Sequence, residues 1–252
     1  MKYLILSLFM FMSCSTKKDI LFLQDASDSK EYNLKYDDIR IKSDDILRIK
    51  VSSKSPEIAS LFSFNQLQNN VSISSIEGFQ IDGYLVNSKG YINIPLLDPI
   101  KVKDLTINES SRLIQDLLSD NEILKNATVD VKIVNAYFTV LGEVNKPGRY
   151  NFLENNMDIF QALGIAGDLT INGKRNDIKI IRKDDDKLKI NSIDITSSEL
   201  LTSNNFQIFP GDVIIINANN ARVKNAGLIG NFGNLLSVLS FILSTVILIS
   251  NN

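Results

Sequence analysis

The chain has 252 residues with a formal net charge of −2, no histidine and a single cysteine. The nearly neutral charge argues against nucleic acid as a partner, because such binding needs clustered Lys and Arg side chains. The missing imidazoles exclude a Ser-His-Asp triad, a histidine proton shuttle and His-liganded zinc or haem. One cysteine is too few to hold an iron–sulfur cluster.

The first residues have the composition of a secretory signal. Lys2 precedes an apolar run, and Ser13 lies directly before Cys14. One basic residue, about ten apolar residues and a small residue are typical of a cleaved signal peptide rather than of a spanning helix. Because the only cysteine coincides with the expected cleavage point, we predict a lipoprotein signal at residues 1–13, lipid attachment at Cys14 and a linker at residues 14–35. The alternative is a plain signal peptide with an incidental Cys14.

Strand-like alternation dominates the middle of the chain. Apolar and charged residues alternate along residues 48–51 and 129–133, which predicts two half-buried strands. Further short strands are predicted at residues 71–76, 140–144, 178–181 and 213–216. Turn-forming residues separate these segments at 87–90, 145–148, 184–187 and 209–212.

Two helices are predicted within this strand-rich part. Thr106 and Glu109 have the spacing of a capping box ahead of an apolar helix face. The second helix is expected from about Asn156 to Ala166, with Gly167 at its C-terminal cap. A weaker third helix is expected around residues 197–201. Short strands mixed with small helices indicate an α+β fold rather than a doubly wound parallel sheet.

No segment has the pattern of a catalytic, cofactor or metal site. The stretch from Gly167 to Arg175 fails the spacing of a phosphate-binding loop and follows a helix instead of a strand. The acidic run at residues 184–186 lacks the glycine and the terminal glutamate of a calcium loop. We therefore predict no enzyme activity, no cofactor and no metal, and keep a carboxylate-dependent glycan hydrolase only as a minor alternative.

The end of the chain carries no charged residue after Lys224. Residues 228–249 are long enough, at about 1.5 Å per residue, to cross the roughly 30 Å hydrocarbon layer of a bilayer as a helix. On a helical wheel, small and uncharged polar residues fall on one side, although Phe241 and Leu248 intrude there. The candidate pore-lining residues are Gly230, Asn231, Asn234, Ser237, Ser240 and Ser244, with Asn231 at the edge of this side.

The wheel alone leaves two interpretations of this helix open. In the first, the helix is a single anchor whose small residues pack against a neighbouring helix. In the second, the small polar side faces a wet lumen, which requires a ring of copies because one helix cannot enclose a pore.

The middle of the chain resembles a known family. Residues 36–51 and 83–95 are similar to the polysaccharide biosynthesis/export domain. The motif Gly142-Glu143-Val144-Asn145-Lys146-Pro147-Gly148 resembles the start of an SLBB domain, a β-grasp module, and residues 162–169 and 210–213 resemble its helix and closing strand. The resemblance is to the Wza-like outer-membrane polysaccharide exporters.

This resemblance implies two small periplasmic domains, an export domain at residues 36–135 and an SLBB domain at 136–217. A linker at 218–227 would join them to the transmembrane helix at 228–249. The resemblance also implies a homo-oligomeric ring of lipoproteins in the bacterial outer membrane that exports capsular or extracellular polysaccharide. The implied partner is an inner-membrane co-polymerase, which in this family is often a tyrosine kinase. The rival hypothesis is a glycan-binding or scaffolding lipoprotein whose C-terminal helix is only an anchor.

Overall fold

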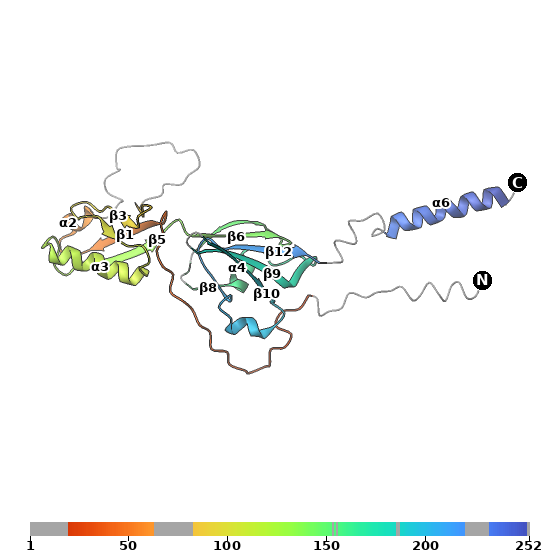
Figure 1. Cartoon of the computed structure of the whole chain (residues 1–252), viewed down its shortest axis with the longest axis horizontal. Coiled ribbons are helices and arrows are strands. Elements are labelled where there is room, and N and C mark those ends of the chain that lie inside the picture. Colours follow the sequence, from red (N-terminus) through yellow and green to blue (C-terminus); the bar gives the residue numbers. More distant parts are fainter. Residues whose placement is uncertain are drawn as a thin grey trace.

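The computed structural model describes residues 20–62, 83–152, 154, 156–184, 187–219 and 232–250. Two α+β domains lie end to end along the molecule (Figure 1). The predicted α+β fold with two domains is therefore confirmed. The expected signal peptide with Cys14, the expected strand at 71–76 and most of the expected linker at 218–227 lie outside the described residues.

The first domain is built around a three-stranded antiparallel sheet in the order β2-β1-β5. Helix α3 packs on β5, and a two-stranded pair, β3–β4, completes the domain. Side chains from all these elements share one apolar core, which includes Leu47, Val131 and Ile114. The elements are β1 (Ile46–Ser52), α2 (Pro56–Ser60), β2 (Tyr84–Leu85), β3 (Tyr91–Ile92), β4 (Ile100–Lys101), α3 (Ile107–Asp120) and β5 (Thr128–Ile133).

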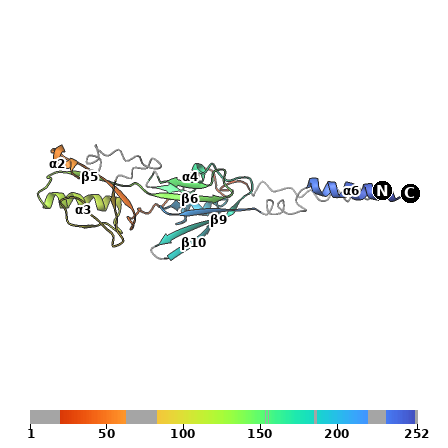
Figure 2. The same ribbon diagram turned by 90° about the horizontal axis from the view of Figure 1, so that it is seen from above.

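The second domain contains a five-stranded mixed sheet in the order β10-β9-β12-β6-β7. Strands β12 and β6 run parallel, and the other neighbours are antiparallel. Helix α4 and the short β8–β11 pair cover one face of this sheet, and the β9–β10 hairpin projects from the domain (Figure 2). The elements are β6 (Tyr137–Gly142), β7 (Gly148–Asn151), β8 (Met157–Asp158), α4 (Ile159–Ile165), β9 (Gly173–Asp184), β10 (Lys187–Ile193), η4 (Ser198–Thr202), β11 (Gln207–Ile208) and β12 (Val213–Ala218).

The two predicted helices form, but the second is shorter than expected. Helix α3 begins at the predicted capping box, in which Thr106 and Glu109 exchange side-chain and backbone hydrogen bonds. Helix α4 begins at Ile159 instead of about Asn156, because Met157 and Asp158 pair with β11 and the Asp158 side chain caps the helix. The helix around residues 197–201 forms as the 3₁₀ helix η4.

One glycine fixes the end of strand β6. Gly142 has φ +92°, a conformation that favours glycine, and a Cβ at this position would lie 2.0 Å from the carbonyl oxygen of Ile216. This close approach of two backbones lets the chain leave the sheet at Gly142. The strand therefore ends two residues earlier than the alternation at 140–144 predicts.

Residues 20–38 run along the second domain before the chain enters the first, and we name them the strap (Figure 1). The backbone of Leu23 donates a hydrogen bond to Ile195 O (3.1 Å), and that of Gln24 donates one to Thr196 O (2.7 Å). Phe22 lies 6.0 Å from Phe160 of α4, measured between ring centroids. The strap thus lies on the same side of the second domain as α4.

Candidate functional site

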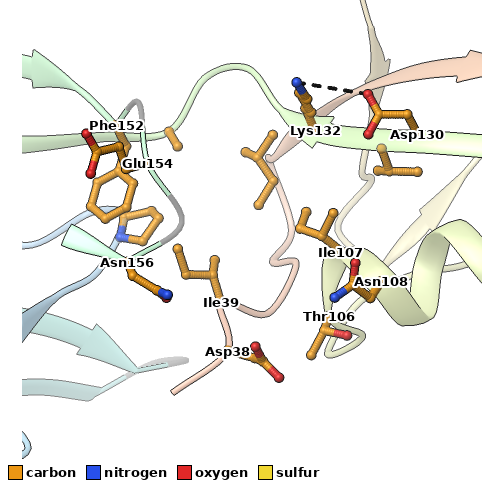
Figure 3. A pocket seen from close by; sticks show the side chains of 14 residues that line it. Asp38, Ile39, Thr106, Ile107, Asn108, Asp130, Lys132, Phe152, Glu154 and Asn156 are labelled. Carbon is orange, nitrogen blue, oxygen red and sulfur yellow. Dashed lines mark ion pairs between the residues drawn. The ribbon is translucent and has the colours of Figure 1, made fainter. Parts of the chain in front are cut away.

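A cavity of about 380 Å³ opens where the two domains meet. The strap contributes Asp38, the first domain contributes Asn108 from α3 and Asp130 from β5, and the second contributes Phe152 and Glu154 from the loop after β7. Figure 3 shows these side chains arranged around the cavity, with those of the two domains on opposite sides. The cavity therefore exists only because three distant parts of the chain converge.

The chemistry of this cavity is that of hydrogen bonding. Asp38 and Glu154 offer carboxylate oxygens, Asn108 and Asn156 offer amide groups, and Phe152 offers an aromatic ring. The Asp130 carboxylate lies 4.0 Å from Lys132 Nζ, and both groups are largely exposed. Carboxylates, amides and a ring can contact a hydroxyl-rich ligand, but a nucleophile with an adjacent base is missing from the cavity's described lining.

The strap is held to the second domain by one buried side chain. Gln207, which is almost fully buried, accepts a hydrogen bond from Asp37 N (2.7 Å) and donates one to Asp37 O (2.9 Å). This side chain therefore pairs with the strap as a neighbouring strand would. At the other end of the strap, the Asp25 carboxylate accepts hydrogen bonds from Ser198 N and Ser197 Oγ, and the Ser198 contact lowers the pKa of Asp25 below its ordinary value.

A buried ion pair stabilises the turn before β12. The Asp212 carboxylate, which is fully buried, accepts hydrogen bonds from Arg182 Nε (2.9 Å), Arg182 Nη2 (2.8 Å) and Phe209 N (2.9 Å). The guanidinium also donates to Gln207 O (3.0 Å) and lies 4.3 Å from the centre of the Phe209 ring. Asp212 is therefore part of the second domain's packing, as the turn motif at 209–212 predicts.

A smaller charged cluster lies on the sheet face away from α4. The Asp177 carboxylate accepts hydrogen bonds from Lys179 Nζ (2.6 Å), Ser192 Oγ (2.6 Å) and Lys174 Nζ (3.0 Å). These contacts, led by the one from Lys179, hold the pKa of Asp177 well below its ordinary value of 3.8. The carboxylate is thus ionised throughout the physiological range, and it neutralises part of a basic surface.

The predicted pore-lining residues lie in or next to helix α6 (Phe232–Ser250). Ser237, Ser240 and Ser244 are exposed, and Asn234 belongs to the helix but its side chain is not described. Ser240 Oγ donates a hydrogen bond to Ser237 O (2.9 Å), and Ser244 Oγ donates one to Ser240 O (2.8 Å). Gly230 and Asn231 lie outside the described residues, as does Cys14.

The structure does not support the prediction of a transmembrane helix at 228–249. Among the described residues, no helix combines the length and the apolar character that crossing a membrane requires.

Comparison with family models divides the chain at the same place as the two cores. Residues 34–134 match the model described as "Polysaccharide biosynthesis/export protein". Residues 137–191 match the SLBB domain model. The chain belongs to the Wza-like polysaccharide export family. No curated protein matches the chain.

Membership in this export family gives the two domains a general role. Both matching families comprise transport or binding domains rather than enzymes. The export-family domains indicate a protein of the periplasm or the outer membrane. They also support a role in exporting or binding polysaccharide.

Sequence reasoning missed the cavity and the strap of this export-family chain. The cavity is lined by polar and apolar residues from separate segments of the chain, and no local spacing connects Asp38 with Asn108 or Glu154. The strap carried a weak signal, because Phe22 and Tyr36 are large aromatic residues in a segment that also contains five carboxylates. Both pack against the second domain, Phe22 on Phe160 and Tyr36 on Phe206.

Proposed function

We propose that this chain is a subunit of an oligomeric outer-membrane channel that exports capsular or extracellular polysaccharide. The observation that carries the proposal is the pair of adjacent family matches at residues 34–134 and 137–191. In this proposal Cys14 is lipidated, and the two domains stand in the periplasm as parts of a homo-oligomeric ring. The ring meets an inner-membrane co-polymerase, for which a tyrosine kinase is one candidate. The transport needs no catalytic residue, no cofactor and no metal.

The surface of α6 supports a membrane or subunit environment for this helix. Ten large apolar side chains of α6 between Leu236 and Ile249 are between 52% and 78% exposed. Leaving such a side chain in water instead of burying it costs about 1.5–3 kcal/mol. An uncharged helix with this surface is therefore stabilised by lipid, by other copies of itself, or by both. The proposal assigns the segment 228–249 of each copy to the wall of the channel.

The serines of α6 suit the passage of a hydrated polymer. The hydroxyl hydrogens of Ser240 and Ser244 are donated to backbone carbonyls, so their oxygens offer lone pairs without a charge. A lumen lined by Gly230, Asn231, Asn234, Ser237, Ser240 and Ser244 would solvate sugar hydroxyls without binding them tightly. Large apolar Phe241 and Leu248 border this proposed lining.

The strap supports a membrane-proximal position for the second domain. Only five residues separate Cys14 from Ile20, and a fully extended chain over these six steps reaches about 20 Å. Leu23 is already hydrogen-bonded to the second domain. A lipid on Cys14 would therefore hold the second domain close to the inner surface of the outer membrane.

The experiment that tests the proposal measures conductance and export. The full chain, purified in detergent and inserted into planar bilayers, is expected to form pores, and Ser240→Asp is expected to raise cation selectivity while the oligomer stays intact. Leu239→Ala, on the other side of α6, is the control and should leave selectivity unchanged. Loss of association in Ser240→Asp, with no pores in the unmodified protein, would instead favour a glycan-binding or scaffolding lipoprotein whose helix only anchors it.

A further inference from the structure

Among the described residues, the five-stranded sheet of the second domain is covered on one face and open on the other. Phe138, Ile180 and Ile214 point into the core under α4 and are fully buried. Their sequence neighbours point the other way, because side chains alternate along a strand. The register places Ile190, Ile181 and Val213 directly opposite one another across β10, β9 and β12 on the open face.

This open face carries a continuous apolar stripe. Ile215 of β12 lies opposite Leu141 of β6 and extends the stripe, while Leu188 lies beside Ile190 on the same face of β10. Leu188 is 70% exposed, Ile190 66% and Leu141 42%. Ile181, Val213 and Ile215, which lie between them, are half-buried. Contiguous apolar side chains with this much surface left exposed mark an interaction surface rather than a solvated one.

Basic side chains flank the stripe. Arg149 and Lys179 project from the open face, Arg149 against the ring of Tyr137 at 3.4 Å, and Lys183 lies opposite Leu188. The only carboxylate that the register places within the described part of this face is Asp177, which its lysine partners already neutralise. The open face is therefore apolar and positively charged.

The opposite side of the same domain has the complementary character. The strap crosses it with five carboxylates and two lysines between residues 20 and 38. Asp28 and Glu31 of the strap are exposed, and so are the apolar side chains of Leu21 and Leu34, at 52% and 47%. The covered side is thus apolar and negatively charged.

We propose that the open sheet face of one subunit docks on the strap side of the next copy of the same chain. Two complementary surfaces on opposite sides of one domain give a head-to-tail contact. Such contacts generate a closed ring when the rotation from one subunit to the next adds up to a full turn. The inference rests on the proposed channel function and deepens it by naming the subunit contact.

The size of the face fits such a contact. Five strands spaced by about 4.8 Å, each about six residues long, present roughly 20 Å by 20 Å. That is about half of the roughly 800 Å² that each partner contributes to a stable interface. The remainder would come from the first domains and from the α6 helices of adjacent copies.

The test compares the oligomer mass of full-length variants in detergent by native mass spectrometry. Ile190→Asp is expected to weaken subunit association by at least about 100-fold, because it would bury an unpaired carboxylate in the contact. Ile171→Asp is the matched control: Ile171 is 72% exposed in the same domain but lies in the loop before β9. It should keep the unmodified mass, and both variants should keep the unmodified melting temperature.

A crosslinking experiment identifies the partner surface. Ile190→Cys combined with Leu34→Cys, in a chain whose only native cysteine is Cys14, should give a ladder of covalent oligomers with a short bismaleimide. Neither single variant should give this ladder. A covalent dimer from Ile190→Cys alone would mean that two open faces meet, and it would overturn the head-to-tail contact.

The two proposals fail in different ways. An unmodified protein that is monomeric both in detergent and in crosslinked membranes would overturn the channel and this contact together. An oligomeric unmodified protein whose mass is unaffected by Ile190→Asp would overturn only the contact.

Discussion

Replacing Asp212 by alanine should destabilise the second domain far more than any change on its surface. The Asp212 carboxylate is fully buried and accepts three hydrogen bonds, two of them from Arg182. The Arg182 side chain is only 20% exposed. Without Asp212, the Arg182 guanidinium would keep its hydrogen bond to Gln207 O but lose its counter-charge. Water has little access to this site and would replace few of the lost contacts.

The expected cost follows from this burial. Removing one partner of a buried ion pair costs about 3–5 kcal/mol, and we expect the lower value because Arg182 retains some contact with water. For a domain of this size, each kcal/mol lowers the melting temperature by about 4–8 °C. Asp212→Ala should therefore lower the melting transition of the second domain by about 12–24 °C.

Scanning calorimetry of the full chain in detergent measures this shift. The matched control is Asp184→Ala, which removes a carboxylate 2.6 Å from Lys189 on the same hairpin, where both side chains are about 60% exposed. An exposed pair of this kind contributes less than about 1 kcal/mol. If Asp212→Ala lowers the melting temperature no more than Asp184→Ala does, the assignment of Asp212 to a buried stabilising pair is wrong.

Three further predictions concern local conformation and acid stability. Gly142→Ala should prevent the second domain from folding, because the added Cβ would overlap the carbonyl oxygen of Ile216 at a residue with positive φ. Gly164→Ala, on the open surface of helix α4, should instead stabilise the domain by about 0.5–1 kcal/mol. Thermal melting followed by circular dichroism distinguishes the two variants. Thr106→Ala should cost about 1 kcal/mol, while Thr106→Ser should restore the cap of α3, as denaturant titration would show. Asp177 has a lowered pKa in the folded chain, so its contribution to the free energy of unfolding is complete above pH about 4 and is lost as the pH falls further. Asp177→Asn should therefore reduce the fall in melting temperature between pH 5 and pH 2.5, and an unchanged fall would contradict this.

Local sequence signals predicted the elements that depend on neighbouring residues. The capping box of Thr106 and Glu109 forms because both partners lie within one helical turn. The alternation at residues 48–51 and 129–133 becomes β1 and β5, whose apolar side chains share one core. The turn at 209–212 forms around a carboxylate within the same four residues.

Features that depend on distant contacts could not be predicted in this way. Helix α4 starts three residues late because Met157 and Asp158 pair with β11, which lies some fifty residues further along the chain. The strap is ordered by Gln207 and by the carbonyls of Ile195 and Thr196, none of which has a local sequence signature. The cavity and the open sheet face likewise arise from the packing of separate segments.

The charge pattern of the second domain also became visible only through the register. In the sequence, Lys179, Lys183 and Arg149 are scattered among carboxylates. Strand pairing collects them beside the apolar stripe of the open face, and the strap collects carboxylates on the opposite side. The net charge of −2 for the whole chain therefore does not reveal that basic and acidic side chains lie on opposite sides of the second domain.

Imaging the lipidated full-length protein in detergent by electron microscopy tests the central claim most directly. We expect closed rings in which the second domains pack head to tail and the C-terminal helices form a barrel. Single particles with the mass of one chain, together with surface polysaccharide that is unaffected by deletion of the chain, would contradict the channel.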